Sequence, residues 1–246
     1  MIKDKVVIVT GAGSGLGREL AIKFTNAGAR VIGLGRNVDK LKKTGEIIEN
    51  SLYEYFTVDV SNFKQIKNAC DDIILNHGHI DILFNNAAIY PKINFLDETD
   101  EQWQHAININ LNGVANCCKA ILPIMIKHNY GKIYNLGSWA DMAPIANSAA
   151  YSCTKGAIHS LTKAIYADIA HLNLNIEVHE WIPGHLKTQM SEFTGMEPSI
   201  AAQWGLEIVN RDNISSKNCI FTNNQEWHPP KSLKQKLKLL LLFWKK

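Results

Sequence analysis

The chain has 246 residues, of which 46% are hydrophobic and 20% are charged, and its formal net charge is +3. This length and composition are typical of one large α/β domain, or two small ones, with a buried core. So small a positive charge argues against an electrostatic surface for nucleic acid, and we expect no nucleic-acid partner.

Six short apolar stretches rich in β-branched residues predict strands, and the segments between them have helical periodicity. Several of these strands are apolar almost throughout, which is typical of parallel strands covered by helices on both faces. The alternation predicts an α/β fold: a single-domain, Rossmann-like, doubly wound parallel sheet over residues 1–230. The predicted strands cover residues 5–10, 29–35, 54–60, 80–86, 131–138 and 175–182.

The first predicted strand runs directly into a glycine-rich turn, TGAGSGLG (residues 10–17), and then into a helix. Gly11, Gly15 and Gly17 are spaced so that a tight turn leads into the helix N-terminus. Free N–H groups and the helix dipole favour a pyrophosphate there. An ordinary turn between a strand and a helix is the alternative, but the succession of strand, turn and helix indicates dinucleotide binding.

The second predicted strand ends in GLGRN (residues 33–37), where such sites distinguish their cofactors. A carboxylate at this point accepts from a ribose 2′-hydroxyl, whereas an arginine accommodates a 2′-phosphate. Gly35 supplies no carboxylate and Arg36 supplies a cation, so the sequence favours NADP(H) over NAD(H). A solvated surface arginine is the alternative for Arg36. Asp59, which closes the third strand, either accepts from the adenine amino group or caps the following helix.

Tyr151 and Lys155 are four residues apart in a predicted long helix and therefore share one helical face. A free phenol with a pKa of about 10 is ionised to only about one part in a thousand at pH 7. A shift of two or three units requires roughly 3 to 4 kcal/mol. A cation about 4 Å away, at an effective dielectric of about 20, supplies that amount. Alone, the pair is typical of an amphipathic helix surface; together with a dinucleotide loop it indicates acid–base catalysis.

Five motifs in this order make the chain resemble the short-chain dehydrogenase/reductase family over about residues 3–190. The motifs are TGAGSGLG (10–17), NNAA (85–88), NLNG (110–113), NLGS (135–138) with YSCTK (151–155), and PG (183–184). Ala88 departs from the family's usual glycine, and VHEWIPG (178–184) replaces a more neutral lead-in to the proline. After residue 195 the family's closing strand and glycine-rich C-terminus are not recognisable.

The resemblance implies an NADP(H)-dependent oxidoreductase that interconverts a carbonyl and a secondary alcohol, with the hydride carried by the cofactor. Tyr151 is then the general acid or base, and Lys155 lowers its pKa and binds the nicotinamide ribose. Ser138 holds the substrate oxygen, and Asn110 holds a water that relays protons to Lys155. The implied cofactor contacts are Gly11, Ser14, Gly15, Leu16, Gly17, Arg36, Asp59, Val60, Asn86, Ala87, Tyr151, Lys155, Pro183 and Gly184, and the implied substrate contacts are Ser138, Tyr151 and His185.

Two further interpretations concern the same region. One is a cofactor-binding protein with a sensing or interaction role and little catalysis. The other is a metal site at His179, Glu180 and His185, but neighbouring strand residues point to opposite faces, so we expect no metal. By analogy with the family, a partly apolar substrate pocket is lined by Tyr90, Trp139, Met142, Met190, Phe193 and Trp204.

Residues 231–246, KSLKQKLKLLLLFWKK, predict a basic amphipathic tail. Such a helix either docks on the body or on a second subunit, which we favour, or lies on an anionic membrane surface. The five cysteines are odd in number and lack metal-ligand spacing, and the N-terminus leaves no room for a signal peptide. We therefore expect a cytoplasmic homodimer or homotetramer, with peripheral membrane contact through the tail as the alternative.

Overall fold

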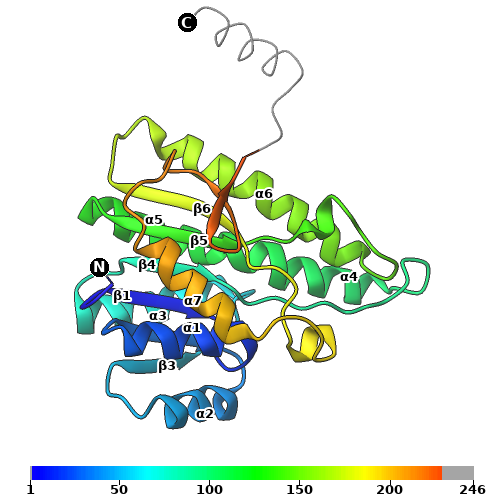
Figure 1. The fold of residues 1–246 in the computed structure, drawn as a ribbon, viewed down its shortest axis with the longest axis horizontal. Coiled ribbons are helices and arrows are strands. Elements are labelled where there is room, and N and C mark those ends of the chain that lie inside the picture. Colours follow the sequence, from blue (N-terminus) through cyan, green and yellow to red (C-terminus); the bar gives the residue numbers. More distant parts are fainter. Residues whose placement is uncertain (1, 229–246) are drawn as a thin grey trace, which may run out of the picture.

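The structure is a computed structural model that describes residues 2–228; residue 1 and residues 229–246, and with them the predicted basic tail, lie outside the described residues. All six predicted strands form within three residues of their expected limits, and two more strands follow them (Figure 1). The strands are β1 (Val6–Thr10), β2 (Arg30–Gly35), β3 (Tyr53–Thr57), β4 (Ile82–Asn85), β5 (Gly131–Leu136), β6 (Ile176–Ile182), β7 (Ile220–Thr222) and β8 (Gln225–Trp227).

The helices fill the intervals between strands, and several begin at local capping signals. Asn37 and Asn62 each cap a helix, with the side-chain oxygen accepting from a backbone N–H three residues further on. The helices are α1 (Gly15–Asn26), α2 (Val38–Ile48), α3 (Phe63–His77), α4 (Asp100–Ile107), α5 (Gly113–His128), α6 (Ala149–Ala170) and α7 (Pro198–Val209), with shorter turns η1 (Asn108–Asn112), η2 (Trp139–Asp141) and η3 (Gln189–Ser191).

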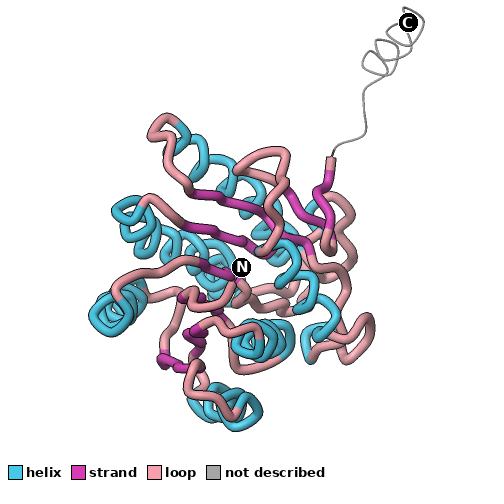
Figure 2. The backbone as a smooth tube through the Cα atoms, turned by 60° about the vertical axis from the view of Figure 1, so that its left-hand side comes forward, coloured by secondary structure: helices cyan, strands magenta, loops and turns pink. Residues whose placement is uncertain are grey.

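The sheet has the order β3-β2-β1-β4-β5-β6-β7-β8, and its pairs are parallel except β7 with β8. The chain winds outward from β1 to β3 and then starts again at β4 on the other side of β1. Helices cover both faces of the sheet (Figure 2). The predicted doubly wound α/β fold is therefore confirmed. Its switch point lies between the ends of β1 and β4, where open sheets of this kind bind ligands.

Strand β1 shows why the predicted strands are continuously apolar. Val7 and Val9 pack into a core shared with α1, α2 and α7, whereas Val6 and Ile8 pack into a second core shared with α3, α5 and α6. Both faces of the strand are buried, so its residues do not alternate between polar and apolar. These two cores fix the register of the sheet and hence the place where its strand ends meet.

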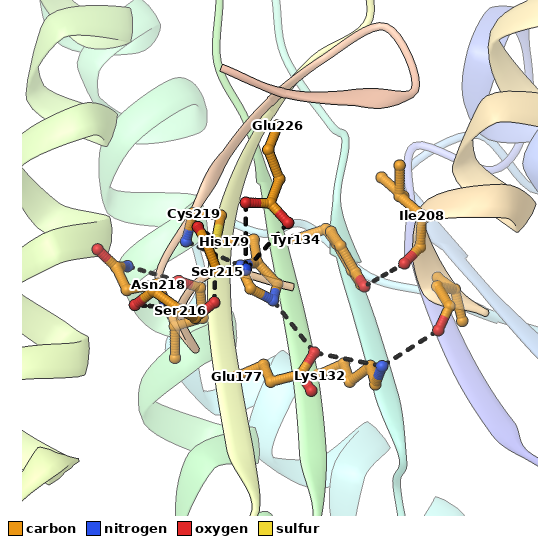
Figure 3. A network of polar contacts seen from close by, with 12 residues as sticks. Lys132, Tyr134, Glu177, His179, Ile208, Ser215, Ser216, Asn218, Cys219 and Glu226 are labelled. Carbon is orange, nitrogen blue, oxygen red and sulfur yellow. Dashed lines mark hydrogen bonds and ion pairs between the residues drawn. The ribbon is translucent and has the colours of Figure 1, made fainter. Parts of the chain in front are cut away.

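The closing strand that the sequence analysis did not recognise is present as β7. It pairs in parallel with β6, and the buried His179 of β6 helps to hold it (Figure 3). The His179 Nδ1 accepts from the backbone N–H of Cys219 at 3.0 Å, and its ring meets Phe221 edge-on at 5.1 Å. A strand of three residues is too short to give a periodicity signal. Contacts with residues that are distant in the sequence stabilise it instead.

The helical segment Asp100–His128 is, within residues 2–228, the one stretch long and apolar enough to span a membrane, with a mean hydropathy of 1.3. In this fold it lies in a helical layer beside the sheet. Cys117, Ile121 and Met125 of α5 are fully buried in the core shared with α3. Packing in the protein interior therefore accounts for its apolar character.

Candidate active site

The glycine-rich turn between β1 and α1 has the geometry of an anion site. Gly11 and Gly15 have positive φ angles of 70° and 51°, and a Cβ on Gly17 would overlap the Gly11 carbonyl. Ser14 precedes α1 without capping it through its side chain, so the N–H groups of the first turn stay available to a ligand. The Leu16 side chain is buried in the core, which leaves its backbone as the part that a ligand can contact.

Thr10 ties this turn to the end of β4. Its buried hydroxyl accepts from the backbone N–H groups of Asn86 and Ala87, each at 2.9 Å. The Asn86 side chain donates in return to the Thr10 carbonyl at 2.9 Å. The structure thus brings the predicted cofactor residues Asn86 and Ala87 to the switch point. Sequence reasoning missed Thr10, whose signal is a hydroxyl residue directly before the first glycine.

Arg36 and Asp59 lie close together just beyond the ends of β2 and β3. The Arg36 Nη1 is 4.0 Å from the Asp59 carboxylate, and the Arg36 side chain is 51% exposed. Partial burial raises the pKa of Asp59, but hydrogen bonds from Ser61 and the charge of Arg36 outweigh it and lower that pKa. Asn62, not Asp59, caps α3, so the capping alternative for Asp59 is wrong. The Val60 side chain is buried in the core.

The predicted catalytic residues Ser138, Tyr151 and Lys155 come together beside the end of β5. Ser138 follows that strand by two residues, and its hydroxyl accepts from the backbone N–H of Ala140 at 3.2 Å. Tyr151 and Lys155 lie in the first two turns of α6, and the Lys155 Nζ is 5.5 Å from the centre of the Tyr151 ring. The same Nζ donates to the backbone carbonyl of Leu136 at 2.7 Å. Two elements, the residues that follow β5 and the first turns of α6, therefore present a hydroxyl, a phenol and an ammonium to one small region.

The electrostatics of this group differ from the prediction in one respect. Burial raises the pKa of Tyr151, and the hydrogen bond from Ser138 offsets only part of this effect. Burial also lowers the pKa of Lys155 to about 8. The pKa of Tyr151 is therefore raised, and not lowered as predicted. The physical reason is that both groups are desolvated and the Lys155 ammonium is directed to the Leu136 carbonyl.

Asn110 lies in the π-helical turn η1, between α4 and α5. Its buried side chain accepts from the backbone N–H of Ile89 at 2.8 Å and donates to the Ile89 carbonyl at 2.9 Å. Its amide also donates to the Thr154 hydroxyl at 3.2 Å, one residue before Lys155. Widened turns of this kind occur frequently at functional sites. Asn110 thus joins the segment after β4 to α6, while its predicted role in holding a water stays a prediction.

Tyr90 lies against the phenol of Tyr151. The two rings are stacked, with centroids 4.7 Å apart and planes inclined by 25°. Lys92, two residues further on, forms an ion pair with Glu192 at 2.5 Å. The segment after β4 therefore contacts both the catalytic helix and the segment after β6.

The aromatic and sulfur-containing residues predicted around the substrate divide into two groups. Met142 and Phe193 are 70% and 65% exposed, in the segments that follow β5 and β6. Trp139 meets Trp227 of β8 edge-on at 5.3 Å, so the hairpin formed by β7 and β8 packs against this region. Trp204 instead packs from α7 against the core that contains α1. Its predicted place beside the substrate stays a prediction.

The Pro-Gly turn after β6 brings its segment over the phosphate loop. Gly184 has a φ of 90°, and a Cβ on Gly15 would lie 3.1 Å from the Thr188 methyl group. The exposed His185 lies with its Nε2 3.0 Å from the Thr194 hydroxyl, so its ring contacts its own loop. The segment that follows Pro183 and Gly184 therefore reaches the phosphate loop at Thr188, a neighbour that sequence reasoning missed, and the cofactor contacts of Pro183 and Gly184 stay predictions.

Within residues 2–228 no cluster of three or more His, Cys, Asp or Glu side chains could hold a metal ion. His179 is directed to Glu177, with its Nε2 3.1 Å from that carboxylate. Glu180 points to the other face of β6, where one of its oxygens lies 2.6 Å from the Nδ1 of His159. The opposite directions of His179 and Glu180 follow from the pleat of the strand.

Comparison with known proteins gives one consistent result. The model of a family described as short chain dehydrogenase matches residues 5–198. An uncharacterized oxidoreductase of Staphylococcus epidermidis is 33% identical over 193 residues, covering 78% of this chain and 83% of the relative. The 3-oxoacyl-acyl-carrier-protein reductase FabG of Thermotoga maritima is 31% identical over 194 residues, covering 78% of each chain. A 3-ketoacyl-acyl-carrier-protein reductase from Brucella melitensis, solved in complex with NADH, has the same fold, with a TM-score of 0.83. The two chains are 23% identical, and the match covers 90% of this chain and 97% of the Brucella melitensis chain.

Proposed function

Because the chain belongs to the short-chain dehydrogenase family and is an oxidoreductase of that family, we propose that it interconverts a carbonyl and a secondary alcohol with NADP(H). The observation that carries the proposal is the meeting of Ser138, Tyr151 and Lys155 beside the end of β5, the strand that pairs with β4. The phosphate loop follows β1, which pairs with the other edge of β4. A hydroxyl, a phenol and a buried cation are the groups that proton transfer to or from a substrate oxygen requires.

A nicotinamide cofactor, when bound, supplies or accepts the hydride. The residues present fit such a group, because the turn at Gly11 to Gly17 leaves N–H groups free and admits no added side chain at Gly17. Ser138 then holds the substrate oxygen near the phenol, and Tyr151 donates its proton to that oxygen during reduction. Lys155, with a pKa of about 8, is charged at neutral pH, and its ammonium, 5.5 Å from the centre of the Tyr151 ring, opposes the burial that disfavours the phenolate.

The preference for NADP(H) rests on the end of β2. The Arg36 side chain is half exposed and within 4.0 Å of Asp59, so its guanidinium is close to where a 2′-phosphate would lie. Gly35 offers no carboxylate to a 2′-hydroxyl. The NADH complex of the Brucella melitensis enzyme keeps NAD(H) as the alternative cofactor. We further propose a small-molecule substrate with an apolar part, and a cytoplasmic homodimer or homotetramer.

A thermal-shift titration with NADPH and NADH, followed by a carbonyl and alcohol panel, tests the proposal. We expect stabilisation by NADPH and turnover of at least one carbonyl. Tyr151→Phe should retain cofactor binding and lose a factor of at least about a hundred in turnover. Tyr166→Phe, in the same helix, is the matched control and should keep the activity of the parent protein. Turnover of Tyr151→Phe within about threefold of the parent would remove Tyr151 from the mechanism.

A further inference from the structure

Glu180 is a buried carboxylate in the middle of the sheet that the proposed mechanism does not use. Its side chain is only 4% exposed. It lies against the backbone of Gly137, where a Cβ would overlap the Glu180 carboxylate oxygen. The Nδ1 of His159, on α6, holds the other oxygen at 2.6 Å. The carboxylate is therefore fixed between β5, β6 and α6.

The ammonium group of Lys155 lies at the same backbone segment. Its Nζ donates to the carbonyl of Leu136, the residue directly before Gly137. A buried ammonium is costly unless a negative charge lies near it. The negative charge of Glu180 raises the pKa of Lys155, although the larger effect of burial lowers it. Within the described residues, Glu180 is the charged group that opposes the effect of burial on the pKa of Lys155.

The other charged groups around this pair come from two elements. On α6, the Nε2 of His159 lies 2.9 Å from the Lys163 ammonium, and the His159 side chain is 32% exposed. From η2, Asp141 packs close to Gly156 of α6, and its charge raises the pKa of Glu180 together with the larger effect of burial. Hydrogen bonding and the charge of His159 oppose both effects.

We propose that Glu180, held in place by His159, is a positioning residue that keeps Lys155 protonated beside Tyr151 and so sets the alkaline limit of catalysis. The inference rests on the proposed function. A carboxylate stabilises the ammonium here because the burial of Lys155 favours the neutral amine. A neutral Lys155 would no longer stabilise the Tyr151 phenolate.

The test is the pH dependence of kcat/KM for carbonyl reduction by the full chain, with Glu180→Gln as the central variant. Glutamine keeps the shape and a hydrogen-bonding group for His159 but removes the charge. We expect the alkaline limb of the profile to move to lower pH by about one unit. His159→Ala should move it in the same direction. His159→Asn, which keeps a donor near the Nδ1 position, should restore the profile of the parent protein.

The matched control is Glu177→Gln, because Glu177 is a partly buried carboxylate of the same strand that pairs with Lys132 and His179 on the opposite face. It should leave the alkaline limb unchanged. A second readout needs no turnover: in thermal unfolding, Glu180→Gln should destabilise the parent protein more than it destabilises Lys155→Met, which has no ammonium to lose its counter-charge.

An unchanged alkaline limb in Glu180→Gln, or additive effects in the unfolding cycle, would overturn the inference. The proposed function fails separately, through Tyr151→Phe retaining turnover or through no carbonyl being reduced. If no carbonyl is reduced, the unfolding cycle still decides whether Glu180 and Lys155 interact.

Discussion

Tyr90 stacks on Tyr151, with ring centroids 4.7 Å apart and planes inclined by 25°. This contact restricts the phenol of Tyr151 on the side of the segment that follows β4. Aromatic pairs of this kind contribute about 0.5–1.5 kcal/mol beyond the area they bury. The stack therefore links the orientation of the Tyr151 hydroxyl to a segment that the sequence places 61 residues earlier.

Removing the Tyr90 ring should loosen the phenol of Tyr151. We expect Tyr90→Ala to lower kcat/KM by about twofold to tenfold, the rate equivalent of the contribution of one aromatic pair. Tyr90→Phe keeps the ring and should stay close to the parent value. Steady-state kinetics on the same carbonyl substrate check both variants, and equal losses in the two would show that the Tyr90 hydroxyl, not the stack, matters.

Arg36 should decide between the two nicotinamide cofactors. A charged hydrogen bond contributes about 1.5–3 kcal/mol, so Arg36→Ala should raise the Kd for NADPH by about tenfold to a hundredfold. Binding of NADH should change little, because NADH has no 2′-phosphate. Cofactor fluorescence titrations measure both constants.

Arg30→Ala is the matched control for Arg36. Arg30 begins the same strand, at its far end, and pairs with Glu54 at 3.1 Å. It should alter neither constant. Equal weakening of both cofactors in Arg36→Ala would assign Arg36 a structural role instead of a discriminating one.

Gly17 should tolerate no side chain. A Cβ there would overlap the Gly11 carbonyl, so Gly17→Ala should lower the free energy of unfolding by about 1–3 kcal/mol. It should also abolish the thermal shift caused by the cofactor. Gly45→Ala, in the interior of α2, meets only the Tyr53 ring at 3.4 Å and should be neutral or stabilising by up to about 1 kcal/mol. Urea denaturation distinguishes them, and a normal cofactor response in Gly17→Ala would contradict the role of the loop.

His179 should make the protein sensitive to acid. Burial lowers the pKa of His179 below its usual value of 6.5, and the Glu177 carboxylate opposes this only in part. Below that pH the unfolded chain binds a proton that the folded protein does not, so the free energy of unfolding falls as the pH falls. We expect the Tm to drop between about pH 7 and pH 5.

His179→Asn separates this effect from other titrations. Asparagine places an oxygen near the Nδ1 position, where it accepts from Cys219, and it does not titrate. The Tm of this variant should fall less over the same pH range. An equal decline of the Tm in both proteins would assign the acid sensitivity to other groups. Glu177 is one of them, because hydrogen bonds and ion pairs outweigh the effect of burial and lower the pKa of its carboxyl.

The predicted β1, phosphate turn and α1 agree with the structure because their signals are local. A continuous apolar strand, glycines at the positive φ positions Gly11 and Gly15, and an apolar helix face all act over a few residues. The pairing of Tyr151 with Lys155 is equally local, since a four-residue spacing on a helix determines a shared face. β7 gave no such signal, because a residue forty positions earlier helps to hold it: the His179 ring accepts from the backbone N–H of Cys219, directly before the strand.

The sequence by itself therefore determined the order of the first six strands and of the helices between them, the phosphate turn and the residue types available for proton transfer. Each of these depends on periodicity and backbone preference over short distances. Only the tertiary structure decided what surrounds the reacting groups. It stacked Tyr90 on Tyr151, placed the Glu180 carboxylate against the backbone of Gly137, and packed Trp204 against the core that contains α1. Desolvation and charge depend on every atom within several ångströms, and most of those atoms belong to residues far away along the chain.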